Sequence, residues 1–316
     1  MSTAEKIPLL VIGGPTATGK TAMGVQLAKT YDGEVVSADS MQLYEGMDIA
    51  TAKPTAAEMD GVPHHLVGCV PLTQSCSASE YVDMATPVIA DIFQRGKLPL
   101  VVGGTGFYIS ALVFHPQFSP ATANANFRAQ CNQYAETYGD EALHQKLQAI
   151  DPESAARIHP HNRVRVIRAL EIYHETGKTA TAWNAQSHTE ESPYRACIMG
   201  LMYETREELY QAIDRRVLRM VQDGLVEEAR RVYESCPSLT AAQAIGIKEL
   251  YPYFAGNADL ADCIAEIQRD TRHYAKRQLT WFKKIPGIMW ITFSNLDNKE
   301  KILEKCKNFV AKTKIL

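Results

Sequence analysis

The chain has 316 residues, of which 46% are apolar and 22% charged, as expected for a folded protein with one large domain or two smaller ones. Its net charge of −3 excludes a uniformly basic surface, so any nucleic-acid contact must come from local basic clusters. The seven cysteines are widely spread without a C-x-x-C pair, which argues against a disulfide framework or a zinc site. Without a secretory signal or a long apolar run, we expect a cytoplasmic protein that does not enter a membrane.

Short apolar runs near both ends of the chain alternate with helical patterns, which predicts a parallel sheet flanked by helices. The predicted strands are Leu9–Gly13, Val35–Ala38, Leu98–Val102, Ala196–Leu201 and Ile288–Phe293. From about Phe118 to Tyr194 only helical patterns occur, with Leu143, Leu147 and Ile150 on one face. We therefore predict an α/β core of residues 1–117 and 195–316, interrupted by an all-helical insertion domain of residues 118–194.

Two local signals concern helices of the second half of the core. Thr205 and Glu208 have the spacing of a capping box, which predicts the start of a helix that continues through Ile213, Val217 and Met220. The Lys-rich segment from Lys299 to Lys314 predicts a solvated amphipathic helix at the end of the chain.

A phosphate-binding loop follows the first predicted strand and precedes a helical pattern. It matches G-x-x-x-x-G-K-[ST] and consists of Gly14, Pro15, Thr16, Ala17, Thr18, Gly19, Lys20 and Thr21. In such a loop the backbone amides and the helix N-terminus face an anion, the lysine neutralises phosphate and the final hydroxyl can bind Mg²⁺. The sequence predicts a P-loop NTPase-like core that binds a diphosphate or larger polyphosphate, with Mg²⁺ as cofactor.

The acidic residue that a nucleotide hydrolase or kinase places after another strand is missing after Leu98–Val102, which runs into Gly103-Gly104-Thr105. The strand Val35–Ala38 instead delivers Asp39 to the carboxyl edge of the sheet, where ligands bind in such folds. A general base, a helix cap and an outer-shell ligand of Mg²⁺ are three interpretations of Asp39 that spacing does not separate.

At this point the chain resembles the bacterial tRNA dimethylallyltransferase family, also called tRNA isopentenyltransferases. The resemblance spans residues 9 to about 284. The shared motifs are G-P-T-A-T-G-K-T (14–21), D-S-M-Q-L-Y-E-G-M-D-I-A-T-A-K-P (39–54), V-G-G-T-G-F-Y (102–108), A-Q-A-I-G-I-K-E (242–249) and R-H-Y-A-K-R-Q-L-T-W-F (272–282). Ile247 departs from the family pattern, in which tyrosine is frequent.

The resemblance implies a reaction and a donor site. Dimethylallyl diphosphate gives its prenyl group to the exocyclic amine of the adenosine 3′-adjacent to the anticodon, in tRNAs that read codons beginning with U. The products are N6-dimethylallyladenosine and diphosphate. By the same resemblance the loop 14–21 holds the donor, Asp39 is the general base, Thr105 approaches donor and acceptor, and Arg216 neutralises the departing diphosphate.

The resemblance also implies which residues contact tRNA, and we expect the enzyme to be a monomer. These residues are Asp39, Ser40, Met41, Gln42, Thr105, Arg128, Arg163, Arg165, Arg168, Gln243 and Lys248. In the insertion, Arg157, Arg163, Arg165 and Arg168 occur without an intervening acid. Their pattern fits a phosphate-binding helix face, although a merely solvated basic face has the same pattern.

A second basic cluster comprises Arg269, Arg272, Lys276, Arg277, Lys283 and Lys284, offset within the segment only by Asp270. Trp281 and Phe282 lie among them and suit either stacking on RNA bases or packing in the core. Three rival functions remain: a small-molecule or nucleotide kinase, a non-catalytic RNA-binding P-loop protein, and a prenyltransferase acting on a free adenine nucleotide. The long arginine-bearing insertion favours a macromolecular acceptor.

Overall fold

The computed structural model describes residues 6–114, 119, 121, 123–186, 191–313 and 315. The chain divides into two compact units, one formed by Met1–Val113 with Ser192–Leu316 and the other by Phe114–Glu191. The domain boundary predicted between residues 117 and 118 lies outside the described residues, and the return boundary lies at 191/192 rather than 194/195.

A six-stranded parallel sheet, ordered β3-β2-β4-β1-β5-β6, forms the centre of the first unit. Its strands are β1 (Ile7–Gly13), β2 (Gly33–Ser37), β3 (His64–His65), β4 (Leu98–Val102), β5 (Tyr194–Tyr203) and β6 (Met289–Phe293). The five predicted strands are confirmed, with ends that differ by a few residues. Strand β3 is not among them, because two residues are too short for a periodic pattern.

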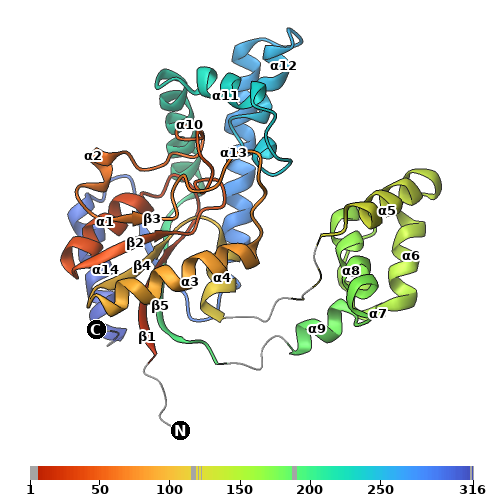
Figure 1. The fold of residues 1–316 in the computed structure, drawn as a ribbon. Helices are drawn as coiled ribbons and strands as arrows, with labels where there is room; N and C mark the ends of the chain where they lie inside the picture. Colours follow the sequence, from red (N-terminus) through yellow and green to blue (C-terminus); the bar gives the residue numbers. More distant parts are fainter. Residues whose placement is uncertain are drawn as a thin grey trace. The chain divides into compact units, whose positions relative to one another are not determined.

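Helices cover both faces of this sheet (Figure 1). Leu10 and Ile12 of β1 pack in one core cluster with residues of α1 (Lys20–Thr30) and α14 (Lys299–Thr313). Leu9 and Val11, which alternate with them, are equally buried, as expected for a strand between two helical layers. Helix α3 (Ala78–Gln94) packs on β2 and β4 and stacks Tyr81 on Tyr108 of α4 (Gly106–Phe114).

The remaining helices of this unit extend beyond the carboxyl ends of the strands (Figure 1). They are α10 (Arg206–Gln222), α11 (Leu225–Glu234), α12 (Tyr251–Phe254) and the 23-residue α13 (Leu260–Phe282), while the short α2 (Ala56–Met59) lies between β2 and β3 in the sequence. Helix α10 packs along α13. Two long helices therefore stand at the edge of the sheet where ligands bind in open α/β folds.

The predicted start of α10 is confirmed, because Thr205 and Glu208 form a reciprocal capping box. The last predicted helix is present over Lys299–Thr313, and it buries Cys306 and Val310 against the sheet unit while its lysines remain on the outside. Lys314 lies outside the described residues.

The second unit consists of helices α5 (Ala125–Tyr138), α6 (Asp140–Ile150), α7 (Pro152–Arg157), α8 (Arg163–Thr176) and α9 (Ala180–Gln186). Its core contains Leu143 and Leu147 of α6 with Val166 and Leu170 of α8, and Ile150 packs against it. The predicted apolar face of α6 is confirmed. This unit therefore has a hydrophobic core of its own.

Candidate active site

The phosphate-binding loop connects the end of β1 to the start of α1. Gly14, Ala17 and Gly19 have φ angles of 137°, 65° and 76°, so the chain turns through the left-handed region three times between the strand and Lys20. The Lys20 ammonium donates to the Pro15 carbonyl at 2.6 Å, and the buried Thr18 hydroxyl donates to the same oxygen at 2.9 Å. These two bonds fold the loop back on itself and hold the Lys20 ammonium against its backbone.

Two cations and one carboxylate meet beside this loop. The pKa of Lys20 is lowered to about 7. Burial is the largest cause and the nearby Arg216 adds to it, whereas Asp39 acts in the opposite direction. Burial likewise lowers the pKa of Arg216, against the attraction of Asp39 and Glu58. Because burial disfavours both positive charges, and Arg216 also disfavours the charge of Lys20, an added anion would stabilise both cations. The structure thus brings together Lys20, Arg216 and Asp39, as predicted from the sequence.

Asp39 follows β2 and uses its two carboxylate oxygens differently. Oδ1 accepts a hydrogen bond from the Met41 amide at 3.0 Å and so caps the turn 39–42. Oδ2 accepts no hydrogen bond from the residues that the structure describes. The capping interpretation is therefore correct for one oxygen, and the other oxygen remains available for a proton.

Thr105 joins this turn to the end of β4. Its amide donates to the Ala38 carbonyl at 3.0 Å, and its hydroxyl accepts from the Ser40 amide at 2.9 Å and donates to the Ser40 hydroxyl at 3.2 Å. The Tyr274 hydroxyl of α13 lies against Thr105 and near Asp39, and burial together with Asp39 raises its pKa above the ordinary range. Thr105, Ser40 and Asp39 consequently form one polar group at the carboxyl edge of the sheet.

Gln42 points into the loop that follows it rather than presenting a free amide. Its Oε1 accepts from the Ser37 hydroxyl at 3.2 Å, and its Nε2 donates to the carbonyls of Thr51 and Ala52 at 3.2 and 3.1 Å. The amide is thus engaged in holding the loop, whereas Met41 lies half-buried in the turn. The expected contact of Gln42 with adenosine stays a prediction.

Glu228 of α11 holds the same loop and is not singled out by the sequence patterns. Its carboxylate is buried and accepts hydrogen bonds from the amides of Asp48, Ile49 and Ala50, each at 2.8 Å. Three amides on one carboxylate replace the water that a buried charge loses. An acid on the same buried helix face as Ala229 and Val232 indicates that its charge needs partners in the protein. The sequence does not show which partners these are, because they lie about 180 residues away.

Gln278 of α13 links the phosphate-binding loop to the turn after β4. Its side chain is 5% exposed; Oε1 accepts from the Thr16 amide at 2.9 Å, and Nε2 donates to the Gly104 carbonyl at 2.8 Å. A Cβ atom at Gly104 would lie 2.4 Å from Gln278 Nε2 and 3.4 Å from Asp39 Oδ2, so a larger residue here would displace the Gln278 amide. Gln278 lies in the shared motif at residues 272–282 and is a residue of the site that the sequence patterns do not single out. Its place on the buried face with Ala275 and Phe282 was the available signal.

The two rings of the second basic cluster behave differently. Phe282 is completely buried, whereas Trp281 is 38% exposed and packs edge-on against the half-exposed Phe107 at 5.5 Å between ring centroids. Asp270 is the only acid within the cluster's own segment, but acids outside that segment also pair with it: Glu266 with Arg269, and Asp214 with Arg272 at 2.5 Å. Lys276, Arg277, Lys283 and Lys284 are exposed.

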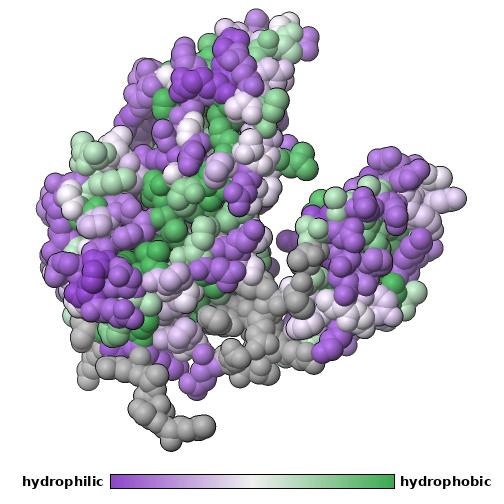
Figure 2. Space-filling model, in the orientation of Figure 1, coloured by the Kyte–Doolittle hydropathy of each residue, from purple (hydrophilic) through white to green (hydrophobic). Residues whose placement is uncertain are grey.

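Figure 2 shows apolar residues gathered across the middle of one face of the sheet unit.

The arginines of the helical unit are not free of acids, contrary to the sequence-based expectation. Asp140 accepts from Arg163 Nε at 2.7 Å, and Glu171 pairs with Arg168 at 2.6 Å and with Arg128 at 2.7 Å. Asp140 lies on α6 and Arg128 on α5, so their pairs with α8 do not follow from the sequence, whereas Arg168 and Glu171 are three residues apart on α8 itself. Arg165 is exposed and makes no ion pair with the described residues.

The two residues predicted to contact RNA before α12 differ in their surroundings. Gln243 is exposed, while Lys248 lies 3.3 Å from Asp270 and 3.4 Å from Glu249. Ile247 between them is completely buried, so this side chain faces the core and not a ligand.

The comparisons with known proteins agree on one family. A family model described as IPP transferase matches residues 42–285. The tRNA dimethylallyltransferase of Halalkalibacterium halodurans is 46% identical over 310 residues, which make up 97% of each chain. The tRNA dimethylallyltransferase of Bacillus subtilis is 45% identical over 289 residues, 90% of each chain.

This chain belongs to the tRNA dimethylallyltransferase family. The solved tRNA isopentenylpyrophosphate transferase of Bacillus halodurans has a TM-score of 0.72 at 44% identity and covers 98% of this chain and 97% of its own. A eukaryotic dimethylallyltransferase acting on tRNA has a TM-score of 0.81 at 29% identity, covering 96% of this chain and 79% of its own. The predicted fold class is thereby confirmed. In the part of this family member that the structure describes, no helix is long and apolar enough to cross a membrane.

Proposed function

We propose that the enzyme transfers the dimethylallyl group of dimethylallyl diphosphate to the exocyclic amine of the adenosine on the 3′ side of the tRNA anticodon. The products are N6-dimethylallyladenosine and diphosphate. One observation carries the proposal: the Asp39 carboxylate, one oxygen of which accepts no hydrogen bond from the described residues, acts electrostatically on both Lys20 and Arg216. A base for the acceptor and two cations for the leaving group are thus present at one edge of the sheet.

The leaving group is the electrostatic problem of this reaction. As the C–O bond to the prenyl carbon breaks, its electron pair departs with the diphosphate, and negative charge grows on the oxygen. Lys20, Arg216 and the amides of the loop 14–19 are positioned to stabilise that charge, and preorganised cations in a low-dielectric site are effective at this. We assign the whole loop, from Gly14 to Thr21, to donor binding.

The residues at the loop fit a Mg²⁺ ion bound mainly through the donor. The Thr21 hydroxyl at the start of α1 is half-buried and makes no hydrogen bond with the described residues, so it is available as an oxygen ligand. No group of three or more His, Cys, Asp or Glu side chains that could hold a metal occurs among the described residues. Magnesium commonly keeps few protein ligands and several phosphate and water oxygens, and it would neutralise diphosphate charge.

The acceptor is a weak nucleophile because the lone pair of the adenine amine is delocalised into the ring. The adenine must therefore leave its stack, and its amine must lose a proton as the new C–N bond forms. We assign that proton to Asp39 Oδ2. Thr105 and Ser40, whose hydroxyls are hydrogen-bonded beside Asp39, would orient donor and acceptor. Met41 and Gln42, which follow Ser40 in the same turn, would line the acceptor site beside them.

The tRNA itself would be held by cationic and polar side chains of both units. We assign this role to Arg128, Arg163, Arg165 and Arg168 of the helical unit and to Gln243 and Lys248 of the sheet unit. Arginine forks suit phosphate oxygens, and phosphate contacts supply most of the salt-dependent affinity for RNA. We further propose that the enzyme acts as a monomer in the cytoplasm.

The proposed function is tested by incubating the enzyme with labelled dimethylallyl diphosphate, Mg²⁺ and either bulk tRNA or AMP. We expect the label to enter tRNA alone, and digestion of that tRNA to release N6-dimethylallyladenosine. Label in AMP would indicate a free-nucleotide prenyltransferase, and no transfer to either acceptor would contradict the proposal.

A further inference from the structure

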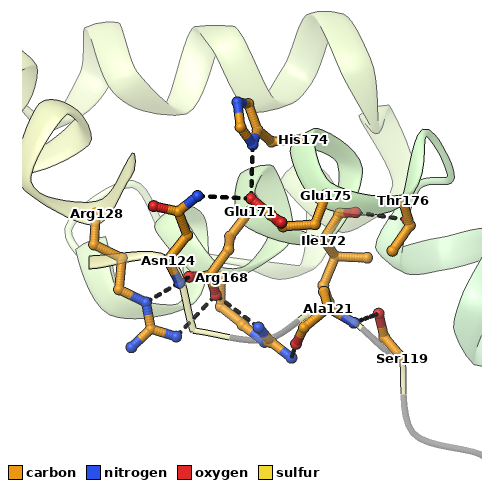
Figure 3. Close-up of polar contacts among 10 residues, drawn as sticks. All are labelled: Ser119, Ala121, Asn124, Arg128, Arg168, Glu171, Ile172, His174, Glu175 and Thr176. Atoms are coloured by element: carbon orange, nitrogen blue, oxygen red, sulfur yellow. Dashed lines mark hydrogen bonds and ion pairs between the residues drawn. The ribbon is translucent and has the colours of Figure 1, made fainter. Parts of the chain in front are cut away.

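Glu171 is a completely buried carboxylate at the middle of the helical unit, and its exposed fraction is 0%. Figure 3 shows two arginines converging on it, Arg128 from α5 and Arg168 from α8 itself. Arg128 donates from Nε to Oε1 at 2.7 Å and from Nη2 to Oε2 at 2.8 Å, while Arg168 Nη1 donates to Oε2 at 2.6 Å. The backbone N–H of Asn124 donates to Oε1 at 2.9 Å.

The carboxylate is ionised throughout the working range of pH. Burial opposes its charge, but the hydrogen bonds from Arg128, Arg168 and the Asn124 amide outweigh burial and lower the pKa of Glu171 to about 2. One negative charge therefore faces two permanent positive charges. The group carries an excess positive charge.

Both arginines keep an exposed side, because the side chain of Arg128 is 44% exposed and that of Arg168 39%. Each guanidinium uses two of its five N–H donors on the protein. The second bond of Arg168 runs from Nη2 to the Ala121 carbonyl at 3.1 Å. Arg128 Nη1 and Arg168 Nε make no hydrogen bond with the described residues. Glu171 thus fixes two guanidinium planes while leaving donors free for another anion.

We propose that Glu171 is a positioning residue that presents Arg128 and Arg168 as a fixed pair for a phosphate of the tRNA backbone. The inference rests on the proposed function, which makes tRNA the acceptor. An arginine that is already held in place loses less conformational entropy when it binds phosphate, so a fixed pair binds more tightly than two mobile side chains. Glu171 itself would not touch the RNA.

A role of Glu171 in neutralising charge and a role in positioning the arginines predict opposite changes in tRNA affinity for the variant E171Q. If Glu171 only neutralises its neighbours, removing its charge makes the surface more basic, and tRNA binds more tightly. If Glu171 positions the arginines, the neutral amide holds both guanidiniums less firmly, and tRNA binds more weakly. The direction of the change therefore distinguishes the two roles.

Glu175 offers a matched control one helical turn away. It accepts from Asn124 Nδ2 at 2.8 Å and lies 2.9 Å from His174 Nδ1, and neither arginine bonds to it (Figure 3). The variant E175Q removes the same charge from the same helix without releasing Arg128 or Arg168. We expect its tRNA dissociation constant to stay within about twofold of the wild-type value.

The experiment measures tRNA dissociation constants of full-length wild type, E171Q and E175Q over a range of salt concentrations, with thermal unfolding and donor binding recorded for each. We expect E171Q to bind tRNA about tenfold more weakly and the donor unchanged. If E171Q is unfolded, Arg128→Lys with Arg168→Lys replaces it, because lysine keeps the charge but cannot form the fork; the same weakening is expected.

Binding of E171Q equal to that of E175Q, or tighter, would overturn the inference and leave the proposed function intact. For the lysine variant, wild-type affinity would overturn it. A wild-type enzyme without affinity for tRNA would overturn the proposed function, and the inference with it.

Discussion

The Thr16 amide donates a hydrogen bond to Gln278 Oε1 at 2.9 Å, although 262 residues separate the two in the sequence. The other end of the same amide group donates to the Gly104 carbonyl at 2.8 Å. One buried side chain of α13 therefore sets the spacing between the loop assigned to the donor and the turn that carries Thr105.

We expect Gln278→Leu to lower kcat/KM for prenyl transfer by about 10- to 100-fold, because loop and turn lose their common partner. Unfolding should become easier by about 1–3 kcal/mol, since the Gly104 carbonyl is left without a hydrogen bond. Steady-state kinetics and thermal unfolding measure the two effects. Gln268→Leu is the control on the same helix, because among the described residues the Gln268 side chain bonds only to the Asp214 carbonyl, at 3.4 Å. Equal kinetics of the two variants would contradict the assigned role.

The ionisation of Lys20 predicts how donor binding changes with pH. Burial, aided by Arg216, lowers the pKa of Lys20 to about 7, and an anionic donor favours the charged form. Donor affinity should therefore be full below pH 7 and weaken above it, by up to about tenfold per pH unit, with proton uptake on binding.

Calorimetric titration of the donor between pH 6 and pH 9, in buffers of different ionisation enthalpy, checks this expectation. Lys20→Arg is the control, because arginine stays charged over this range while the donor's own titration is unchanged. A pH dependence that is equally steep in both proteins would show that Lys20 is not the titrating group.

The exposed Arg165 and the paired Arg168 should contribute differently to tRNA binding. For Arg165→Ala we expect the slope of log affinity against log salt to flatten by about 0.7–0.9, the loss of one phosphate contact. Arg165→Ala with Arg168→Ala should flatten it further and leave donor binding unchanged. Filter-binding titrations at several salt concentrations measure the slopes. If the double variant matches wild type at every concentration, the RNA site belongs instead to the cluster from Arg269 to Lys284.

Local patterns predicted the sheet and the loop well, because each depends on neighbours in the sequence. Strands β1 and β4 follow from continuous apolar runs, and the α10 cap from Thr205 and Glu208. Asp39 could be placed near Lys20 because both follow parallel strands, whose carboxyl ends share one edge.

Partnerships across the chain were not predictable in the same way. Arg128 and Glu171 are 43 residues apart, and no periodicity in one sequence relates α5 to α8. The same holds for Glu228, whose three amide partners precede it by about 180 residues. Tertiary packing brings Asp140 to Arg163 and Arg128 to Glu171, while the pair of Arg168 with Glu171 is local to α8 and has the i,i+3 spacing of a helix.

The most direct test of the account is single-turnover prenyl transfer by Asp39→Asn, with tRNA affinity measured on the same protein. Asparagine can still accept the Met41 amide hydrogen bond, so the turn keeps its cap while the base is lost. We expect the rate of transfer to fall by about 10²- to 10⁴-fold, the usual contribution of a positioned general base, and tRNA affinity to change little. An unchanged rate, or a loss that appears mainly as weaker tRNA binding, would contradict the assignment of Asp39 as the base.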